Sequence, residues 1–143
     1  MIYQSAQFDR MLLNIGKNDK NVAMLTTISG IGIRSAVQLM SSIIDINRFK
    51  SIDQFCAYFG IVPCVRDSGG KESHSHITKA GDPMVRAILN RSAFIHIQNC
   101  ESSITSLYER KSSVSKKKAL TAASHKMLKI IYAVLKGREP FRL

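Results

Sequence analysis

Residues 64–76 read CVRDSGGKESHSH and bring together several side-chain types that can do chemistry. Ser68 is followed by two glycines and preceded by Arg66, and two histidines lie near the end of the stretch. A serine hydroxyl acts as a nucleophile when a base, a metal ion or rigid positioning activates it. A serine beside glycines is more often simply part of a turn. The local sequence therefore leaves both roles open.

The surroundings of Ser68 suit a phosphate. Gly69 and Gly70 would let the backbone approach an anion closely, as in other anion-binding turns. The cations that lie within reach in the sequence are Arg66, Lys71, Lys79 and Arg86. Either histidine, His74 or His76, could serve as the base, and either could equally be an exposed loop residue. Phosphoryl transfer needs such charge compensation, so this stretch is a candidate phosphate site.

The charge of the chain also points to a polyanion as partner. The 143 residues carry a net charge of +11. Residues 1–65 hold six Lys or Arg against four Asp or Glu, whereas residues 66–143 hold fifteen against six. A field of this size attracts a polyanion, although a solvated lysine surface is the simpler alternative. Positive charge at a helix start opposes the helix dipole, which favours a ligand-facing role for Lys116, Lys117 and Lys118.

Cysteine usage and hydropathy indicate the cellular compartment of the protein. The three cysteines are widely spaced and form no CxxC pair, so the sequence supports neither a zinc ribbon nor a disulfide framework. The N-terminus MIYQSAQFDR lacks the apolar run of a signal peptide, and no stretch reaches membrane-spanning length. We expect a soluble, intracellular protein with no membrane partner.

The elements that would position these residues are mainly helical. Apolar spacing predicts helices over residues 2–15, 33–44, 83–99 and 116–136, with shorter ones between them. Asp19, Ser51 with Gln54, Asp82 before Pro83, and Ser102 or Ser103 are the predicted N-terminal caps. Helical periodicity disappears around residues 61–78, where we expect a short β-hairpin or an irregular insert. The predicted fold class is therefore a mainly α domain with one non-helical insert.

Residues 24–40, MLTTISGIGIRSAVQLM, predict a helix-hairpin-helix unit extending to about residue 44. Such a unit joins two helices by a hydrophobic-Gly-hydrophobic-Gly turn and binds DNA phosphates without reading bases. Glycines would allow positive φ and close approach, and the start of the second helix offers unpaired N–H groups. The predicted phosphate ligands are Gly30, Ile31, Gly32 and Arg34. A tight helix–helix turn with no ligand is the alternative.

Five motifs in a fixed order resemble one protein family. They are the GIG turn, FGIVP, DSGGK, ITKAGDPMVRAIL and KKALTAASHKMLKIIYAVLKGREPF. Their order is similar to that in the C-terminal domain of insertion-sequence transposases that join a RuvC-like DEDD domain to a serine-bearing domain. The resemblance runs from about residue 21 to residue 141. Each short motif is unspecific by itself, whereas their order is specific.

The resemblance implies a role for Ser68 as the nucleophile that attacks a DNA phosphodiester and holds the strand as a phosphoserine. It also implies that Mg²⁺ is bound by the RuvC-like domain, so we expect no metal site in this chain and no metal at Asp67 and Glu72. A member of this family is further expected to be a cytoplasmic, nucleoid-associated prokaryotic protein. Members of the family act as homo-oligomers on DNA and are guided by a structured RNA. Tyr58, Tyr108 and Tyr132 have no Arg/His constellation around them, which argues against a tyrosine recombinase.

The RuvC-like domain is missing from this sequence, and this departure from the family limits what we expect of the chain. The predicted organisation is an N-terminal helix or linker (1–20) and a transposase domain (21–143). Within that domain lie the hairpin unit (24–44), the serine loop (61–80) and a basic helical part (82–137). We expect binding to nucleic acid but no complete recombination by this chain alone. The alternative is a non-catalytic binding or oligomerisation module.

Overall fold

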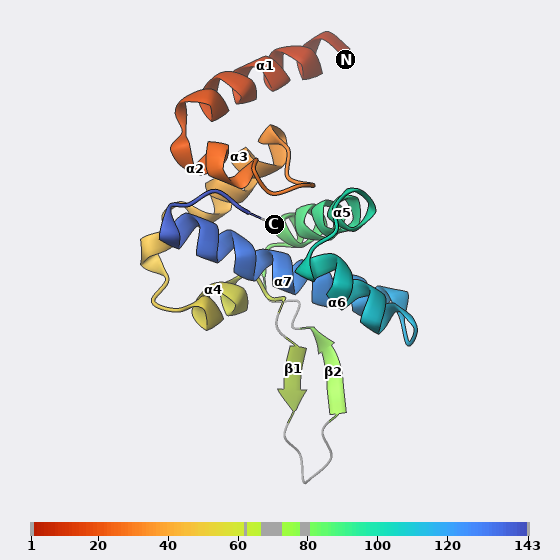
Figure 1. Cartoon of the computed structure of the whole chain (residues 1–143). Coiled ribbons are helices and arrows are strands. Elements are labelled where there is room, and N and C mark those ends of the chain that lie inside the picture. Colours follow the sequence, from red (N-terminus) through yellow and green to blue (C-terminus); the bar gives the residue numbers. More distant parts are fainter. Residues whose placement is uncertain (1, 62, 67–72, 78–80, 143) are drawn as a thin grey trace.

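The computed structural model describes residues 2–61, 63–66, 73–77 and 81–142, with side chains described for residues 4–61 and 81–142. The described part is mainly helical, which confirms the predicted fold class at this level (Figure 1). In chain order, the helices are α1 (Ile2–Asn18), α2 (Lys20–Leu25), α3 (Ile33–Ile43), the short 3-10 helix η1 (Ile46–Arg48), α4 (Ile52–Tyr58), α5 (Pro83–Asn99), α6 (Ser103–Ser112) and α7 (Lys116–Gly137).

The predicted N-terminal caps are confirmed. Asp19 Oδ1 accepts from the N–H groups of Asn21 and Val22, at 2.8 and 3.4 Å. In the same way, Ser51 caps α4, Asp82 caps α5 and Ser102 caps α6. Each cap satisfies a helix donor that would otherwise lack a partner, and such a bond stabilises a helix by about 1 kcal/mol.

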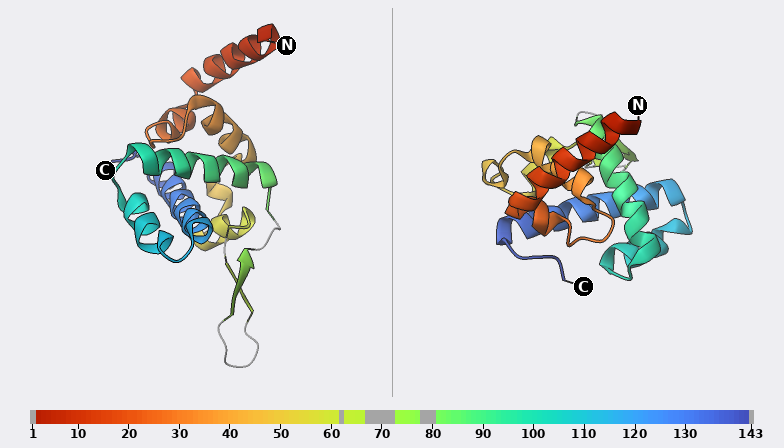
Figure 2. Two further views of the ribbon diagram at one scale, coloured as in Figure 1. Left: turned by 90° about the vertical axis from the view of Figure 1, so that its right-hand side faces the viewer. Right: turned by 90° about the horizontal axis from the view of Figure 1, so that it is seen from above.

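Helix α1 continues through Gly16, where we expected the helical pattern to break. A Cβ atom on Gly16 would lie 3.2 Å from Val22 Cγ1 and 3.3 Å from Ile33 Cγ2. The missing side chain therefore lets α1 pack closely against α2 and α3, and this contact offsets the low helix propensity of glycine. The N-terminal end of α1 extends away from the other helices (Figure 2).

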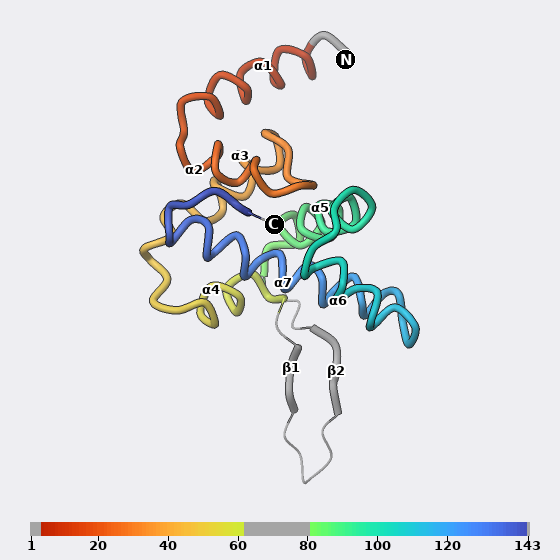
Figure 3. Tube along the Cα trace, in the orientation of Figure 1, coloured from red at the N-terminus to blue at the C-terminus, as the bar shows by residue number. Residues whose placement is uncertain are grey.

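Helix α7 forms the centre of the core. It runs across the middle of the molecule, with α2, α4, α5 and α6 around it (Figures 1 and 3). Its apolar side is fully or almost fully buried and includes Met127, Leu128, Ile131 and Leu135. Phe55 and Phe59 from the α4 region join the same core, with ring centroids 5.1 Å apart. Burial of these side chains by α7 holds the N-terminal helices to the C-terminal half.

Strands β1 (Pro63–Arg66) and β2 (Ser73–Ile77) pair in antiparallel fashion, with Arg66 opposite Ser73. The chain enters and leaves this segment at one point, because a Cβ atom on Gly81 would lie only 2.2 Å from the carbonyl oxygen of Phe59. No side chain fits there, so a glycine is required for this close approach. Arg86 Nη1 donates to the carbonyl oxygen of Gly81 at 2.7 Å and so fixes the point where α5 begins.

Candidate nucleic-acid interface

The turn between α2 and α3 is held tightly against α5. Gly30 has φ +96°, and a Cβ atom there would lie 2.3 Å from the carbonyl oxygen of Ser92. Ile31 is buried, and its N–H donates to the carbonyl oxygen of Ile28 at 3.1 Å. Both predicted phosphate ligands therefore have a structural role. Gly30 packs against α5, and Ile31 has a buried side chain and an N–H that is already hydrogen-bonded.

A buried histidine fixes the same turn, and sequence reasoning missed it. The His96 ring is fully buried, with Nδ1 at 2.7 Å from the carbonyl oxygen of Ser29 and Nε2 at 2.7 Å from Ser102 Oγ. A carbonyl only accepts, so Nδ1 donates to Ser29, whereas the Ser102 hydroxyl can pair with Nε2 as donor or acceptor. His96 thus ties the turn to α5 and to the start of α6. A helical apolar pattern gives no signal for such a residue, because its partners are distant in sequence.

Gly32 and Arg34 are the parts of the turn that face solvent. Gly32 is the N-cap of α3 with φ −83°, and no atom of the described residues lies within 4 Å of an added Cβ. The expected positive φ is therefore found at Gly30 and not at Gly32. Within the described part of the chain, no side chain caps the first turn of α3, so its N–H groups remain available to an anion. The Arg34 side chain is 58% exposed.

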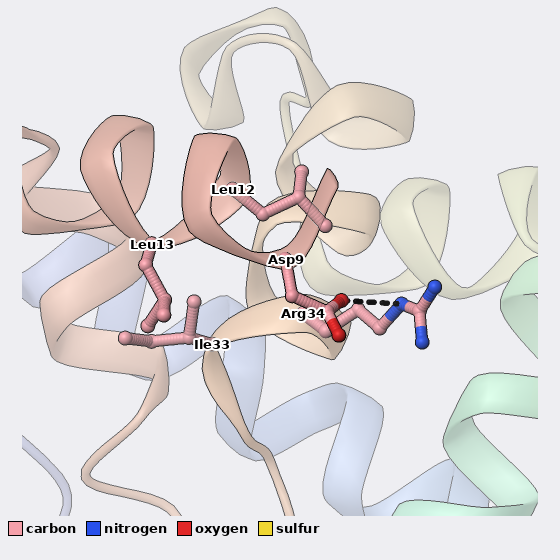
Figure 4. Close-up of a pocket in the computed structure, with 5 residues that line it drawn as sticks. All are labelled: Asp9, Leu12, Leu13, Ile33 and Arg34. Carbon is pink, nitrogen blue, oxygen red and sulfur yellow. Dashed lines mark ion pairs between the residues drawn. The ribbon is translucent and has the colours of Figure 1, made fainter. Parts of the chain in front are cut away.

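Helix α1 places a carboxylate beside this helix start. Asp9 Oδ1 lies 3.8 Å from Arg34 Nε, and the Arg34 guanidinium carbon lies 5.9 Å from the centre of the Phe8 ring. Figure 4 shows this ion pair at the edge of a shallow pocket lined by Asp9, Leu12, Leu13, Ile33 and Arg34. Both charged groups are half exposed, so their attraction is screened and contributes little to stability. The Asp9 charge nevertheless lowers the positive potential at the start of α3.

The predicted lysine cluster lies apart from the start of α3. Lys116, Lys117 and Lys118 are exposed in the first turn of α7, where Ser115 is the cap. Figure 1 shows this helix start beside the end of α6 and away from the start of α3. The fold therefore separates two cationic regions instead of joining them into one site.

The serine segment lies largely outside the described residues. Ser68, Gly69, Gly70, Lys71 and Lys79 all fall there, and so do Asp67 and Glu72. Arg66 is described only as part of β1, opposite the first residue of β2. His74 and His76 belong to β2, again without described side chains. Arg86 is half-buried and already donates one hydrogen bond to a backbone carbonyl, so only its remaining N–H groups can meet a ligand.

Two titratable groups lie between α4 and α7, near the start of the β segment. Burial lowers the pKa of His125, Lys129 lowers it further, and the Ile61 backbone and Asp53 act in the opposite direction. The His125 Nδ1 atom is buried and has no hydrogen-bond partner among the residues that the structure describes. Burial likewise raises the pKa of the Cys56 thiol, which Lys129 counteracts. These shifts disfavour the charged form of each group.

Neither a metal cluster nor a membrane span is found in the described part of the chain. There, no group of three or more His, Cys, Asp or Glu side chains lies close enough to hold a metal ion. Within the same residues, no helix combines the length and apolar character needed to cross a bilayer.

Comparison with known proteins defines the class. The sequence model of the Transposase IS116/IS110/IS902 family matches residues 22–109, so the chain belongs to this family. Its relatives include the transposase for insertion sequence element IS1111A of Coxiella burnetii, with 28% identity over 142 residues, 94% of this chain and 38% of that protein. The transposase for IS1328 of Yersinia enterocolitica is 33% identical over 98 residues, 68% of this chain and 29% of that protein. A probable family 20 transposase of Pseudomonas aeruginosa is 30% identical over 95 residues. The chain spans less than two fifths of the length of these relatives.

Proposed function

We propose that this chain is the DNA-binding, serine-bearing part of an insertion-sequence transposase, and that it cleaves and transfers DNA strands together with a RuvC-like domain. The family match over residues 22–109 carries the proposal, because that range includes both the α2–α3 turn and the serine segment. The net charge of +11 supports a nucleic acid as the partner. The intact protein would act as a homo-oligomer with a guide RNA.

The α2–α3 turn would bind a DNA phosphate as a helix-hairpin-helix unit. The uncapped first turn of α3, the open space beside Gly32 and the exposed Arg34 support this role. N–H groups at a helix start stabilise an anion by hydrogen bonds and by the helix dipole. Such contacts carry no base information, so sequence choice would come from elsewhere.

Ser68 would be the nucleophile. Its Oγ would attack phosphorus, and the bond from phosphorus to the leaving sugar oxygen would break, which leaves one DNA strand attached as a phosphoserine. The hydroxyl proton must pass to a base, for which His74 and His76 remain candidates, and the leaving oxygen must gain a proton. Mg²⁺ on the RuvC-like domain would add charge compensation that this chain does not supply.

A trapped covalent adduct tests the catalytic part. The intact transposase, guide RNA and labelled DNA would be mixed and denatured, and the protein-linked DNA would be measured. We expect an adduct with the wild type and none with Ser68→Ala, whereas Ser106→Ala on the exposed side of α6 serves as the control. Adduct formation and strand exchange that survive Ser68→Ala would rule out this nucleophile and favour a non-catalytic binding or oligomerisation module.

Salt dependence tests the binding part separately. If six to eight cations contact phosphates, the slope of log affinity against log salt should be about −5 to −7. Fluorescence anisotropy with a duplex at several salt concentrations measures it. A slope of about −1 would contradict a polyanion interface. It would favour a packing domain whose role is to hold protomers together.

A further inference from the structure

The end of α3 contains a strained residue that presents a large apolar side chain to solvent. Ile44 has φ +64° and ψ −69°, and its side chain is 70% exposed. The Asp45 N–H donates to the carbonyl oxygen of Ile43 at 2.8 Å, which makes a three-residue γ-turn with Ile44 at its centre. A β-branched residue is strained in this conformation, and the exposed side chain of Ile44 gains little burial to offset the strain. Strain of this kind is often found where a surface contacts a ligand.

An arginine lies close to two aromatic rings beside this turn. The guanidinium carbon of Arg48 is 4.7 Å from the ring centres of both Phe49 and Tyr58. Arg48 Nη2 donates to the carbonyl oxygen of Ser42 at 3.3 Å, which ties the guanidinium to α3 two residues before Ile44. Phe49 is buried, whereas Arg48 is exposed and Tyr58 is 52% exposed. Arg48 thus contacts two rings that are inclined by 66° to each other, and its side chain still meets solvent.

The charges around this surface are mainly positive. The Lys136 ammonium donates to Asn47 Oδ1 at 3.3 Å, so the end of α7 brings a cation next to η1. Lys50 is exposed just after Phe49. The nearest acidic group in sequence, Asp45, already accepts a hydrogen bond from the Asn47 N–H at 2.9 Å. The surface therefore combines a planar cation, an exposed aromatic ring and further cations.

We propose that Ile44, Arg48 and Tyr58 form a stacking platform for an unpaired base of a single-stranded nucleic acid. A base stacks on the exposed Arg48 guanidinium, Tyr58 and Ile44 extend the apolar contact, and Lys136 and Lys50 attract the flanking phosphates. The contacts of Arg48 with the two rings and with the Ser42 carbonyl restrain its side chain, which lowers the entropy that binding would otherwise cost. The inference rests on the proposed function and specifies which form of nucleic acid this surface takes.

A duplex is a poorer occupant for this surface than a single strand. Bases in a duplex are stacked on each other, so their faces are inaccessible to a guanidinium. A duplex would contact only the charges, and Lys would then replace Arg without loss. This difference provides the discriminating variant.

The test uses a single strand of about 20 nucleotides that contains 2-aminopurine, and the matching duplex, each titrated with the full chain. Arg48→Lys keeps the positive charge and removes the planar guanidinium group. We expect it to weaken single-strand binding roughly fivefold to tenfold and to abolish the 2-aminopurine quenching that stacking causes, with duplex binding changed less than about twofold. Arg110→Lys, at an exposed site on α6, is the matched control and is expected to change neither.

Ile44→Gly provides a second variant, which is expected to fold as stably as the wild type. Glycine adopts positive φ without strain, so the urea midpoint should stay the same or rise while single-strand affinity falls. Unchanged single-strand binding in Arg48→Lys, or an equal loss on duplex and single strand, would overturn the platform. If the platform fails in this way and the wild type still binds the duplex, the proposed DNA-binding function remains. If neither the single strand nor the duplex shows salt-dependent binding, both the platform and the proposed function are wrong.

Discussion

The Nδ1 atom of His96 in α5 lies 2.7 Å from the carbonyl oxygen of Ser29, in the turn that joins α2 to α3. The two residues are 67 positions apart, so the conformation of the turn depends on a helix from the other half of the chain. The same ring contacts the cap of α6 through Ser102 Oγ. A turn whose exposed side is proposed to hold a phosphate is thus fixed from its buried side.

Removal of the His96 hydrogen bonds should destabilise the fold. His96→Leu removes the side-chain partner of the half-buried Ser29 carbonyl and the bond from His96 to Ser102 Oγ, which still caps α6 through the Ile104 N–H. Each lost hydrogen bond costs about 1–3 kcal/mol. We expect the free energy of unfolding, measured with urea, to fall by about 3 kcal/mol. Asn99→Ala, at an exposed position on the same helix, is expected to change it by less than about 1 kcal/mol. Equal stability of the two variants would contradict a role for His96 in fixing the turn.

The two glycines of the GIG turn should respond in opposite ways. Gly30→Ala places a Cβ atom against the Ser92 carbonyl at positive φ, so we expect a loss of about 2 kcal/mol or more in the free energy of unfolding. Gly32→Asp finds open space and caps the bare start of α3, so stability should stay the same or rise by about 0.5 kcal/mol. Thermal and urea unfolding of both variants measure this difference.

Gly32→Asp also separates binding from folding. The new carboxylate would occupy the N–H groups proposed for the phosphate and would repel DNA, so we expect duplex affinity to drop roughly tenfold in a fully folded protein. Gly137→Asp, which also meets open space at the end of α7, is the charge-matched control. Equal affinities of the two variants would show that the start of α3 does not bind DNA.

Asp9 should restrain DNA binding. Asp9→Asn removes the carboxylate 3.8 Å from Arg34 Nε, which leaves Arg34 free for a phosphate and raises the local potential. We expect duplex affinity to rise about threefold at low salt, and this gain should shrink as salt is added. Glu101→Gln, an exposed acidic site after α5, makes the same change in net charge. A similar gain from Glu101→Gln would mean that only the total charge matters.

His125 should make the fold sensitive to acid. Burial holds its folded pKa below the usual value near 6.5, so the unfolded chain binds the proton more readily. The resulting stability is fully present above about pH 6.5 and is lost as the pH falls through the folded pKa. The urea midpoint should therefore fall less between about pH 8 and about pH 5 in His125→Gln than in the wild type. Identical pH profiles would show that His125 does not contribute to this loss.

Local signals in the sequence determined the helix starts. Asp19, Ser51, Asp82 and Ser102 were predicted as caps because a cap contacts N–H groups only two or three residues away. The helix over residues 116–136 was predicted correctly as α7 for the same reason, since its apolar period lies within one helix. The chemistry proposed for Ser68 came from the order of motifs and stays a prediction.

The tertiary structure alone decided which predicted ligands remain free. Gly30 and Gly32 look equivalent in the sequence, yet α5 covers the first and leaves the second open. The pairing of Arg34 with Asp9 and the hydrogen bond from His96 to Ser29 join residues far apart in the chain. Sequence periodicity reports the neighbours of a residue along its own helix, whereas packing between helices sets its contacts across the fold. For this reason the sequence indicated a phosphate-binding turn, and the fold determined which side of it can meet a phosphate.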